Sequence, residues 1–172
     1  MSALAACAGT SGMEAANADE ASAQMAMATL QAPDGTARGT AQAIETDSGV
    51  KLTITGENLP AGSHGVHVHM TGVCTPPDFS SAGGHWNPMQ KQHGKNNPQG
   101  MHMGDLPNLL IGTDGRGSME ITVPGADLAS GSNPMLDADG AAMVVHAGPD
   151  DMVSDPSGNS GGRIACGAFT VG

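Results

Sequence analysis

Residues 83–105 constrain this chain more than any other segment. They contain three histidines and end in an aspartate, and most of the remaining positions are Gly, Pro, Asn and other polar residues that favour turns. The sequence therefore predicts a long loop without regular structure, which needs something to order it. Its four notable side chains are His85, His93, His102 and Asp105.

Three imidazoles and one carboxylate are the ligand set and the ligand count of a closed tetrahedral zinc site. Binding of a metal ion would supply the free energy that orders such a loop. The alternative is a solvated surface loop that contains histidines by chance. We favour the zinc site, because unrelated surface loops rarely gather three histidines and a terminal Gly-Asp in so short a segment.

Composition indicates one domain without a nucleic-acid partner. The chain has 172 residues, which is enough for a single well-buried core. Aromatic residues make up only 2%, so the core must consist of Val, Ile, Leu, Ala and some of the twelve Met. Six basic and seventeen acidic residues give a net charge of −11, the wrong sign for binding phosphate.

Short runs of strand-forming residues, separated by turn residues, predict an all-β fold. In residues 50–57, apolar and polar residues alternate, which is typical of a half-buried strand. Asp114-Gly115 between two apolar runs predicts a hairpin. Eight strands are expected, at 25–31, 36–46, 50–57, 65–70, 109–111, 118–123, 141–146 and 163–171. We therefore predict an eight-stranded antiparallel Greek-key barrel or sandwich with two long loops, at 83–105 and 148–162.

Three further histidines lie on the predicted strands. His67 and His69 are two residues apart, so both imidazoles project from the same face of a strand. Such a pair is weak evidence for a metal by itself, because strand histidines can also be polar surface. His146 ends the buried strand at 141–146.

The first 24 residues differ from the rest. Leu4-Ala5-Ala6-Cys7 resembles the lipobox of a bacterial lipoprotein, but six residues before Cys7 are too few for a signal peptide. We interpret residues 1–24 as a signal remnant and a disordered tether, and residues 25–172 as the folded domain. The alternative is an Ala-rich terminus with a stray cysteine. Without Cys7 an even pair of cysteines remains, as expected in an oxidising compartment such as the periplasm.

Taken together, these motifs resemble the copper/zinc superoxide dismutases, of the bacterial secreted kind, over roughly residues 36–171. The resemblance is strongest in four motifs that follow one another in the family's order, with a fifth, shorter match at VVH (144–146). The four are HGVHVH (64–69), GHWNP (84–88), HG (93–94) followed by HMGDLPN (102–108), and GGRIACG (161–167).

The resemblance implies two metal ions that share one histidine. It assigns copper to His67, His69, His85 and His146, and zinc to His85, His93, His102 and Asp105. His85 would then bridge the two ions as an imidazolate. An all-nitrogen site suits Cu(II), whereas three imidazoles and a carboxylate suit zinc. For the seventh histidine, His64, we expect a structural role beside the copper strand.

The resemblance also implies roles for residues outside the ligand sets. Asp150 would hydrogen-bond both a copper and a zinc histidine, here His67 and His93. Arg163 would stand beside the copper and attract the anionic substrate, superoxide, while His85 would supply a proton. Cys74 and Cys166 match the two half-cystines of the family. The expected activity is dismutation of superoxide to O2 and H2O2 by cycling of copper between Cu(II) and Cu(I).

One departure from the family pattern concerns electrostatic steering. Related bacterial enzymes often carry a lysine in the loop after the last copper histidine, but Met152-Val153-Ser154 offers none. Steering is then expected to rest on Arg163, and activity to depend less on salt. Two rival hypotheses remain, namely a copper- and zinc-binding module without turnover and an interaction protein with structural metals. The sequence is compatible with a monomer or a homodimer in the periplasm or cell envelope, attached to a membrane only through a lipid on Cys7.

Overall fold

The computed structural model describes residues 24–172 of the chain. The expected tether and the candidate lipidation site Cys7 lie outside the described residues, apart from residue 24. Within residues 24–172, regular structure consists of ten strands and one short 3-10 helix, η1 at Ser80–Ala82. The same part of the chain contains no helix with the length and apolar character needed to cross a membrane.

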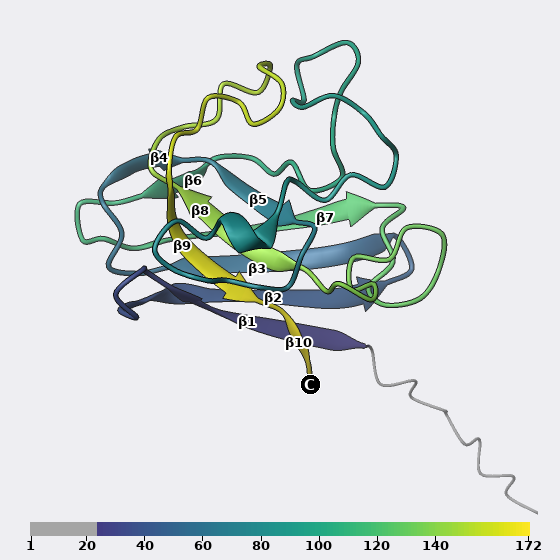
Figure 1. Cartoon of the computed structure of the whole chain (residues 1–172), viewed down its shortest axis with the longest axis horizontal. Coiled ribbons are helices and arrows are strands. Elements are labelled where there is room, and N and C mark those ends of the chain that lie inside the picture. Colours follow the sequence, from purple (N-terminus) through teal and green to yellow (C-terminus); the bar gives the residue numbers. More distant parts are fainter. Residues whose placement is uncertain (1–23) are drawn as a thin grey trace, which may run out of the picture.

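Eight of the ten strands form one large sheet (Figure 1). Along the sheet the order is β5-β8-β9-β1-β2-β3-β7, and β10 pairs with β1. All pairings between these strands are antiparallel. The strands are β1 (Met25–Gln31), β2 (Ala37–Thr46), β3 (Gly49–Gly56), β5 (Val66–His69), β7 (Gly117–Pro124), β8 (Ala142–His146), β9 (Arg163–Ala168) and β10 (Thr170–Val171). The remaining two, β4 (Gly62–His64) and β6 (Leu109–Ile111), pair with each other.

The expected all-β architecture is confirmed, with two corrections in detail. All eight expected strands are present, but the chain forms two more, because β4 precedes the histidine strand and the last strand divides into β9 and β10. The Asp114-Gly115 turn is present, and Gly115 has a positive φ of 76°. The prediction that the two strands beside this turn pair with each other is nevertheless wrong. Strand β6 pairs with β4, and β7 pairs with β3.

Alternation along the strands places the core on one face of the sheet. In β3, Val50, Leu52 and Ile54 are fully or almost fully buried, while the residues between them are at least partly exposed. Burial of each such side chain contributes roughly 1.5–3 kcal/mol of hydrophobic free energy. In β1 the buried positions are occupied by Ala26, Ala28 and Leu30, in keeping with the scarcity of aromatic residues.

Strand β5 is buried on both faces. Val66 and Val68 pack into the main core, so His67 and His69 project from the opposite face. That face is covered by the two long loops, which lie on the same side of the sheet in Figure 1. Backbone hydrogen bonds attach the first loop to β5, including Trp86 N–H to Val68 O at 2.8 Å and Val68 N–H to Gly104 O at 2.9 Å. The edge of β5 thereby fixes where the histidine-rich loop runs.

Candidate metal centre

Two groups of potential ligands meet on the outer face of β5. The copper-side cluster is defined as His67, His69, His85 and His146, and the zinc-side cluster as His85, His93, His102 and Asp105. Within each cluster, one ligand atom per residue lies within 4.8 Å of all the others, and every member is buried. The structure thus brings together all seven expected ligands and places His85 in both clusters.

The copper-side histidines come from strands and from one loop. His67 and His69 alternate with the core valines of β5, and His146 ends β8, which pairs with β5. The loop contributes His85, whose backbone forms a bridge to His69. The imidazoles of His67 and His85 are stacked, with ring centroids 3.9 Å apart.

One nitrogen of each copper-side histidine is buried without a partner. These atoms are Nδ1 of His67 and Nε2 of His69, His85 and His146, and only one other buried side-chain atom in residues 24–172 lacks a hydrogen bond. Buried polar atoms are almost always hydrogen-bonded, so four such atoms in one cluster need an explanation. A metal ion that accepts their lone pairs satisfies all four, so the cluster fits a metal.

The other ring nitrogens of the three strand histidines are held by acceptors. His67 Nε2 donates to Asp150 Oδ2 at 2.6 Å, His69 Nδ1 to Gly83 O at 2.9 Å and His146 Nδ1 to Gly161 O at 3.0 Å. Such bonds fix the orientation of a metal-binding imidazole and its tautomer.

Burial keeps the free nitrogens unprotonated. It is the main cause that lowers the pKa of His67 to about 3, of His69 to about 2 and of His146 to about 4. Each ring therefore offers a lone pair at neutral pH, which is what a metal ligand requires.

The zinc-side cluster has the dimensions of a tetrahedral site. Oδ1 of Asp105 lies 2.8 Å from His85 Nδ1, 3.0 Å from His93 Nδ1 and 3.1 Å from His102 Nδ1. The Nδ1 atoms of His85 and His102 are 3.4 Å apart. Ligands about 2.0 Å from a tetrahedral zinc ion are roughly 3.3 Å from one another, so these four spacings, within about 0.5 Å of that value, are compatible with zinc.

Asp105 is held in place and held ionised. Its Oδ2 accepts the backbone N–H groups of Gly94 at 2.9 Å and His102 at 3.0 Å. Burial alone would raise the pKa of Asp105, but the hydrogen bonds from His102, His85 and Gly94 keep this pKa well below its usual range. The cluster therefore presents one negative charge to a cation.

Asp150 links the two clusters, as the family resemblance implies. Its two oxygens accept from His67 Nε2 and, at 3.0 Å, from His93 Nε2. Burial opposes ionisation of Asp150, but these bonds outweigh it and lower its pKa to about 2. Asn108 in turn holds Asp150: its amide donates to Asp150 O at 2.9 Å and its Oδ1 accepts from Asp150 N–H at 2.8 Å.

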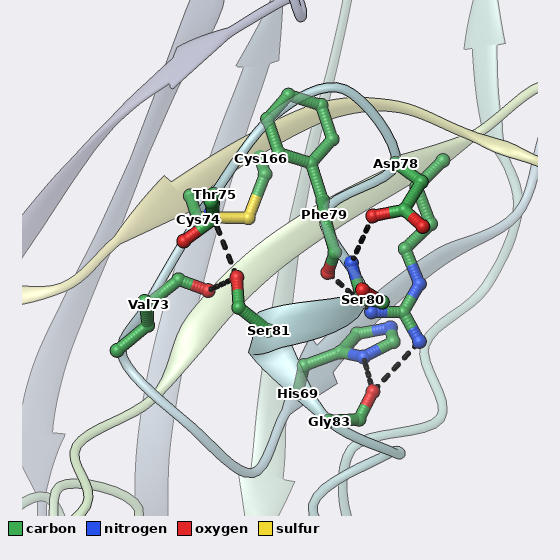
Figure 2. Close-up of a disulfide and its surroundings, with 11 residues drawn as sticks. His69, Val73, Cys74, Thr75, Asp78, Phe79, Ser80, Ser81, Gly83 and Cys166 are labelled. Carbon is green, nitrogen blue, oxygen red and sulfur yellow. Dashed lines mark hydrogen bonds between the residues drawn. A yellow bond between two sulfur atoms is a disulfide. The ribbon is translucent and has the colours of Figure 1, made fainter.

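Arg163 is fixed by two backbone carbonyls beside the copper-side cluster. Its Nη1 donates to Phe79 O at 2.6 Å and its Nη2 to Gly83 O at 2.7 Å. The same Gly83 carbonyl accepts from His69, as Figure 2 shows. The guanidinium is thereby positioned relative to a copper-side histidine.

A disulfide holds the segment that carries those carbonyls. Cys74 is bonded to Cys166 of β9, with their Cα atoms 5.7 Å apart (Figure 2), and this confirms the expected pairing. Cys166 also packs in a second apolar cluster with Phe79, Ala82 and residues of β8.

A cleft of about 440 Å³ opens beside the copper-side cluster, and it is large enough for a small anion. It is lined by His69, Gly84, His85, His102, His146, Pro156, Ser157, Gly161 and Arg163. The cleft thus leads from solvent to three of the four copper-side histidines, past one fixed cationic side chain.

The remaining histidine has the structural role expected for it. His64 is buried in β4, with Nδ1 2.8 Å from His146 O and Nε2 2.8 Å from Pro60 O. Both ring nitrogens face backbone carbonyls, so the ring supports the backbone of His146 instead of joining a cluster.

Sequence reasoning missed several residues that hold the ligands. Gly83 and Gly161 act through backbone carbonyls, which every residue possesses, so no residue pattern points to them. Asn108 belongs to the HMGDLPN motif, and its position three residues after Asp105 was the available signal. Asp155, which accepts the backbone N–H of His93 at 2.6 Å, had no recognisable signal in its Gly/Pro/Ser-rich loop.

Comparison with known proteins agrees with this geometry. Residues 34–169 match the family model for copper/zinc superoxide dismutase (SODC). A superoxide dismutase-like protein of Bacillus subtilis is 47% identical over 72% of this chain, and the match spans 64% of that relative's length. "Superoxide dismutase [Cu-Zn] 1" of Aquifex aeolicus is also 47% identical, over 75% of this chain and 78% of its own length.

Solved structures are similar as well. The crystal structure of a SOD-like protein from Bacillus subtilis has a TM-score of 0.80 and 41% identity, covering 84% of this chain and 97% of that chain. The Cu/Zn superoxide dismutase from Brucella abortus has a TM-score of 0.66 and 28% identity, covering 85% and 99%. The fold and the site define a two-metal β-barrel protein. The chain belongs to the copper/zinc superoxide dismutase family.

Proposed function

We propose that this protein is a copper/zinc superoxide dismutase, which converts two superoxide anions and two protons to O2 and H2O2. The observation that carries the proposal is the set of four unpartnered buried nitrogens, on histidines of which three line a cleft that also contains Arg163. A site that only stored metal would need neither an open cleft nor a fixed guanidinium beside it. Family membership of the chain supports the same activity.

The proposed metal assignment follows the chemistry of the donor sets. The copper-side cluster offers four nitrogens, which suit copper, and the zinc-side cluster offers three nitrogens and a carboxylate, which suit zinc. His85 serves both clusters, because its Nδ1 faces Asp105 and its Nε2 faces the copper-side histidines.

Copper, when bound, supplies a one-electron acceptor and donor. Arg163 binds the superoxide anion and orients it, because its guanidinium is held by two carbonyls and cannot turn away from the cleft. His85 holds and delivers a proton at Nε2, while its Nδ1 stays at the zinc-side cluster and keeps the ring in place. His85 is buried, so bulk water has little access to its ring, whereas Arg163 is partly exposed in the cleft where the anion arrives.

Charge distribution determines how the anion reaches the site. The whole chain carries a net charge of −11, which repels superoxide at long range. A cleft that contains Arg163 and two divalent cations reverses this sign locally and focuses anions, an effect for which this enzyme family is itself an example. Arg163 is therefore proposed as the main guide for the substrate.

Reconstitution of the protein with copper and zinc tests this function. We expect two ions per chain and catalytic dismutation, with His146→Ala nearly inactive and Arg163→Ala lowered at least about ten-fold in kcat/KM. Ser63→Ala, a change in β4 outside both clusters, is the control and should keep full activity. Two bound ions without turnover would favour the metal-binding module instead. Unchanged turnover in both His146→Ala and Arg163→Ala would contradict the assigned roles.

We further infer that the protein works in the periplasm or cell envelope, as a monomer or homodimer. The disulfide supports this, since such bonds persist in oxidising compartments. Attachment through a lipid on Cys7 is a separate proposal that rests on the sequence Leu4-Ala5-Ala6-Cys7. Fractionation of cells that express the native gene, with and without Cys7→Ser, tests both.

A further inference from the structure

Asp155 connects the second long loop to the zinc-side cluster. Its Oδ1 accepts the backbone N–H of His93, a residue 62 positions earlier in the chain, at 2.6 Å. The same oxygen lies 4.0 Å from Nε2 of His102. One carboxylate thus faces two of the three zinc-side histidines, although it belongs to neither cluster.

The surrounding backbone shows that this connection is tight. Asn96 N–H donates to Met152 O at 2.9 Å, so the two loops are also joined next to Asp155. Gly158 has a positive φ of 62°, and a Cβ at this position would lie 2.7 Å from His93 Nε2. The second loop therefore approaches His93 so closely that only glycine fits at residue 158.

The ring nitrogens that point away from the proposed ions show which negative charge Asp155 provides. Asp150 holds the second ring nitrogens of His67 and His93. For His102, the Asp155 carboxylate is the acidic group that its Nε2 faces. Burial opposes a positive charge on His102, but Asp105 first and then Asp155 and the Lys91 carbonyl raise its pKa above the ordinary value. Asp155 thus supplies negative charge behind a ligand, as carboxylates behind metal-binding histidines do.

We propose that Asp155 is a positioning residue for zinc: it fixes the backbone of His93, places a negative charge near the His102 imidazole and places the adjoining cleft wall. Pro156 and Ser157, which follow it directly, line the cleft that leads to the copper-side cluster. The zinc-side cluster and the wall of the substrate passage thereby share one anchor. This inference rests on the proposed assignment of zinc to His85, His93, His102 and Asp105.

The charge of Asp155 near His102 and its hydrogen bond to His93 are expected to contribute unequally to zinc affinity. Its side chain is 48% exposed, so water screens its charge toward His102. The hydrogen bond to His93 is short and partly buried, and it is charge-assisted. We therefore expect that loss of the hydrogen bond costs more zinc affinity than loss of the charge alone.

Zinc titration of copper-free protein, in competition with a chromogenic chelator, tests this. Asp155→Ala removes both the bond and the charge and should raise the zinc Kd by about 10- to 100-fold. Asp155→Asn keeps an oxygen that accepts from His93 and should raise it less. The visible spectrum of Co2+ bound in place of zinc reports the arrangement of the ligands and should change in Asp155→Ala.

Asp151→Ala is the matched control, because Asp151 accepts hydrogen bonds only within its own loop, from Val153, Ser154 and Asn159. It should leave the zinc Kd and the Co2+ spectrum near those of the unaltered protein. An equal loss of affinity in Asp151→Ala, or a Kd within two-fold of the unaltered value in Asp155→Ala, would overturn the inference. If Asp155→Ala does not fold, Asp155→Ser, whose side chain is too short to reach the His93 N–H in the same way, takes its place, and an unchanged Kd and Co2+ spectrum in that variant overturn the inference. Unaltered protein that binds no zinc would instead overturn the metal assignment itself.

Discussion

The copper-side and zinc-side clusters share His85 but are built on different supports. His67, His69 and His146 stand on β5 and β8, whose opposite faces pack in the main core. Their orientation is therefore set by the sheet before any ion binds. The zinc-side ligands all come from residues 83–105, which contain only isolated bridges and turns. Their arrangement depends on hydrogen bonds to Asp105, on contacts from the second loop, and on the ion.

The difference shows how one protein can combine a fixed site with a dependent one. Strand-borne histidines offer a preorganised set of nitrogens, which suits a metal that must change oxidation state without moving its ligands. Loop-borne ligands gain order when zinc binds, because part of the free energy of metal binding is used to order the loop. His85 belongs to the loop yet completes the strand set, so in the proposed assignment zinc would also position one copper-side ligand.

A large effect is expected from the covalent tie between loop and sheet. The double change Cys74→Ala and Cys166→Ala opens a loop with a sequence separation of 92 residues. Chain entropy predicts a loss of about 4–5 kcal/mol in the free energy of unfolding. Urea unfolding of the variant and the parent measures it, with the reduced parent as a control. A loss below 1 kcal/mol would mean that the sheet alone stabilises the fold.

Removal of both metals should affect the zinc-side loop and the sheet differently. When zinc is present at 100 times its Kd, binding stabilises the ordered loop by about 2.7 kcal/mol, or about 100-fold in hydrogen-exchange protection. We expect this loss of protection in residues 92–105 of the metal-free protein, while β1, β2 and β3 keep theirs. Equal loss in β5 and β8 would contradict the distinction between strand-borne and loop-borne ligands.

Acid should destabilise the metal-free protein through its strand-borne histidines. The pKa values of His67, His69 and His146 are about 3, 2 and 4 in the folded chain, against about 6.5 when unfolded. Between pH 6.5 and 4 the unfolded chain binds more protons, so stability falls as the pH falls. The slope is about 1.4 kcal/mol per pH unit for each histidine. Urea unfolding of metal-free protein at pH 8, 6 and 5 measures it, and a stability independent of pH would exclude these low values.

The smallest expected effect concerns salt. Residues 152–154 carry no lysine, so steering of superoxide is assigned to Arg163. Raising the ionic strength from about 0.01 to 0.15 M shortens the screening length from about 30 to 8 Å and should lower kcat/KM only weakly. In Arg163→Ala the remaining salt dependence should vanish or reverse. A salt dependence as steep as that of relatives with a loop lysine would show that other cations guide the substrate.

The fold was largely predictable from the sequence, because periodicity and turn residues are local signals. Val50, Leu52 and Ile54 mark the buried face of a strand whatever its neighbours are. The pairing of β6 with β4 instead of β7 was not predictable, since Asp114-Gly115 specifies a turn but not the ladder beyond it. Likewise, the pairing of β10 with β1 was not predictable, because the two strands lie near opposite ends of the sequence and a two-residue strand has no periodicity.

The side chains of the site were predictable, but their supports were not. Histidine and aspartate side chains are common metal ligands, and the family resemblance assigns each of them to copper or to zinc. Gly83 and Gly161 contribute only carbonyl oxygens, and Asp155 contributes through a bond to a residue 62 positions away. Such contacts exist only after the chain has folded.

The shared position of His85 is the central claim, and the electron paramagnetic resonance spectrum of bound Cu(II) tests it most directly. Adding zinc to copper-loaded protein should change this spectrum, because zinc at Nδ1 alters the imidazole whose Nε2 binds copper. In His85→Ala, zinc should leave the copper spectrum unaffected, the spectrum itself should differ from that of the parent, and zinc affinity should fall by at least about 100-fold. A copper spectrum in His85→Ala identical to that of the parent would contradict the bridge.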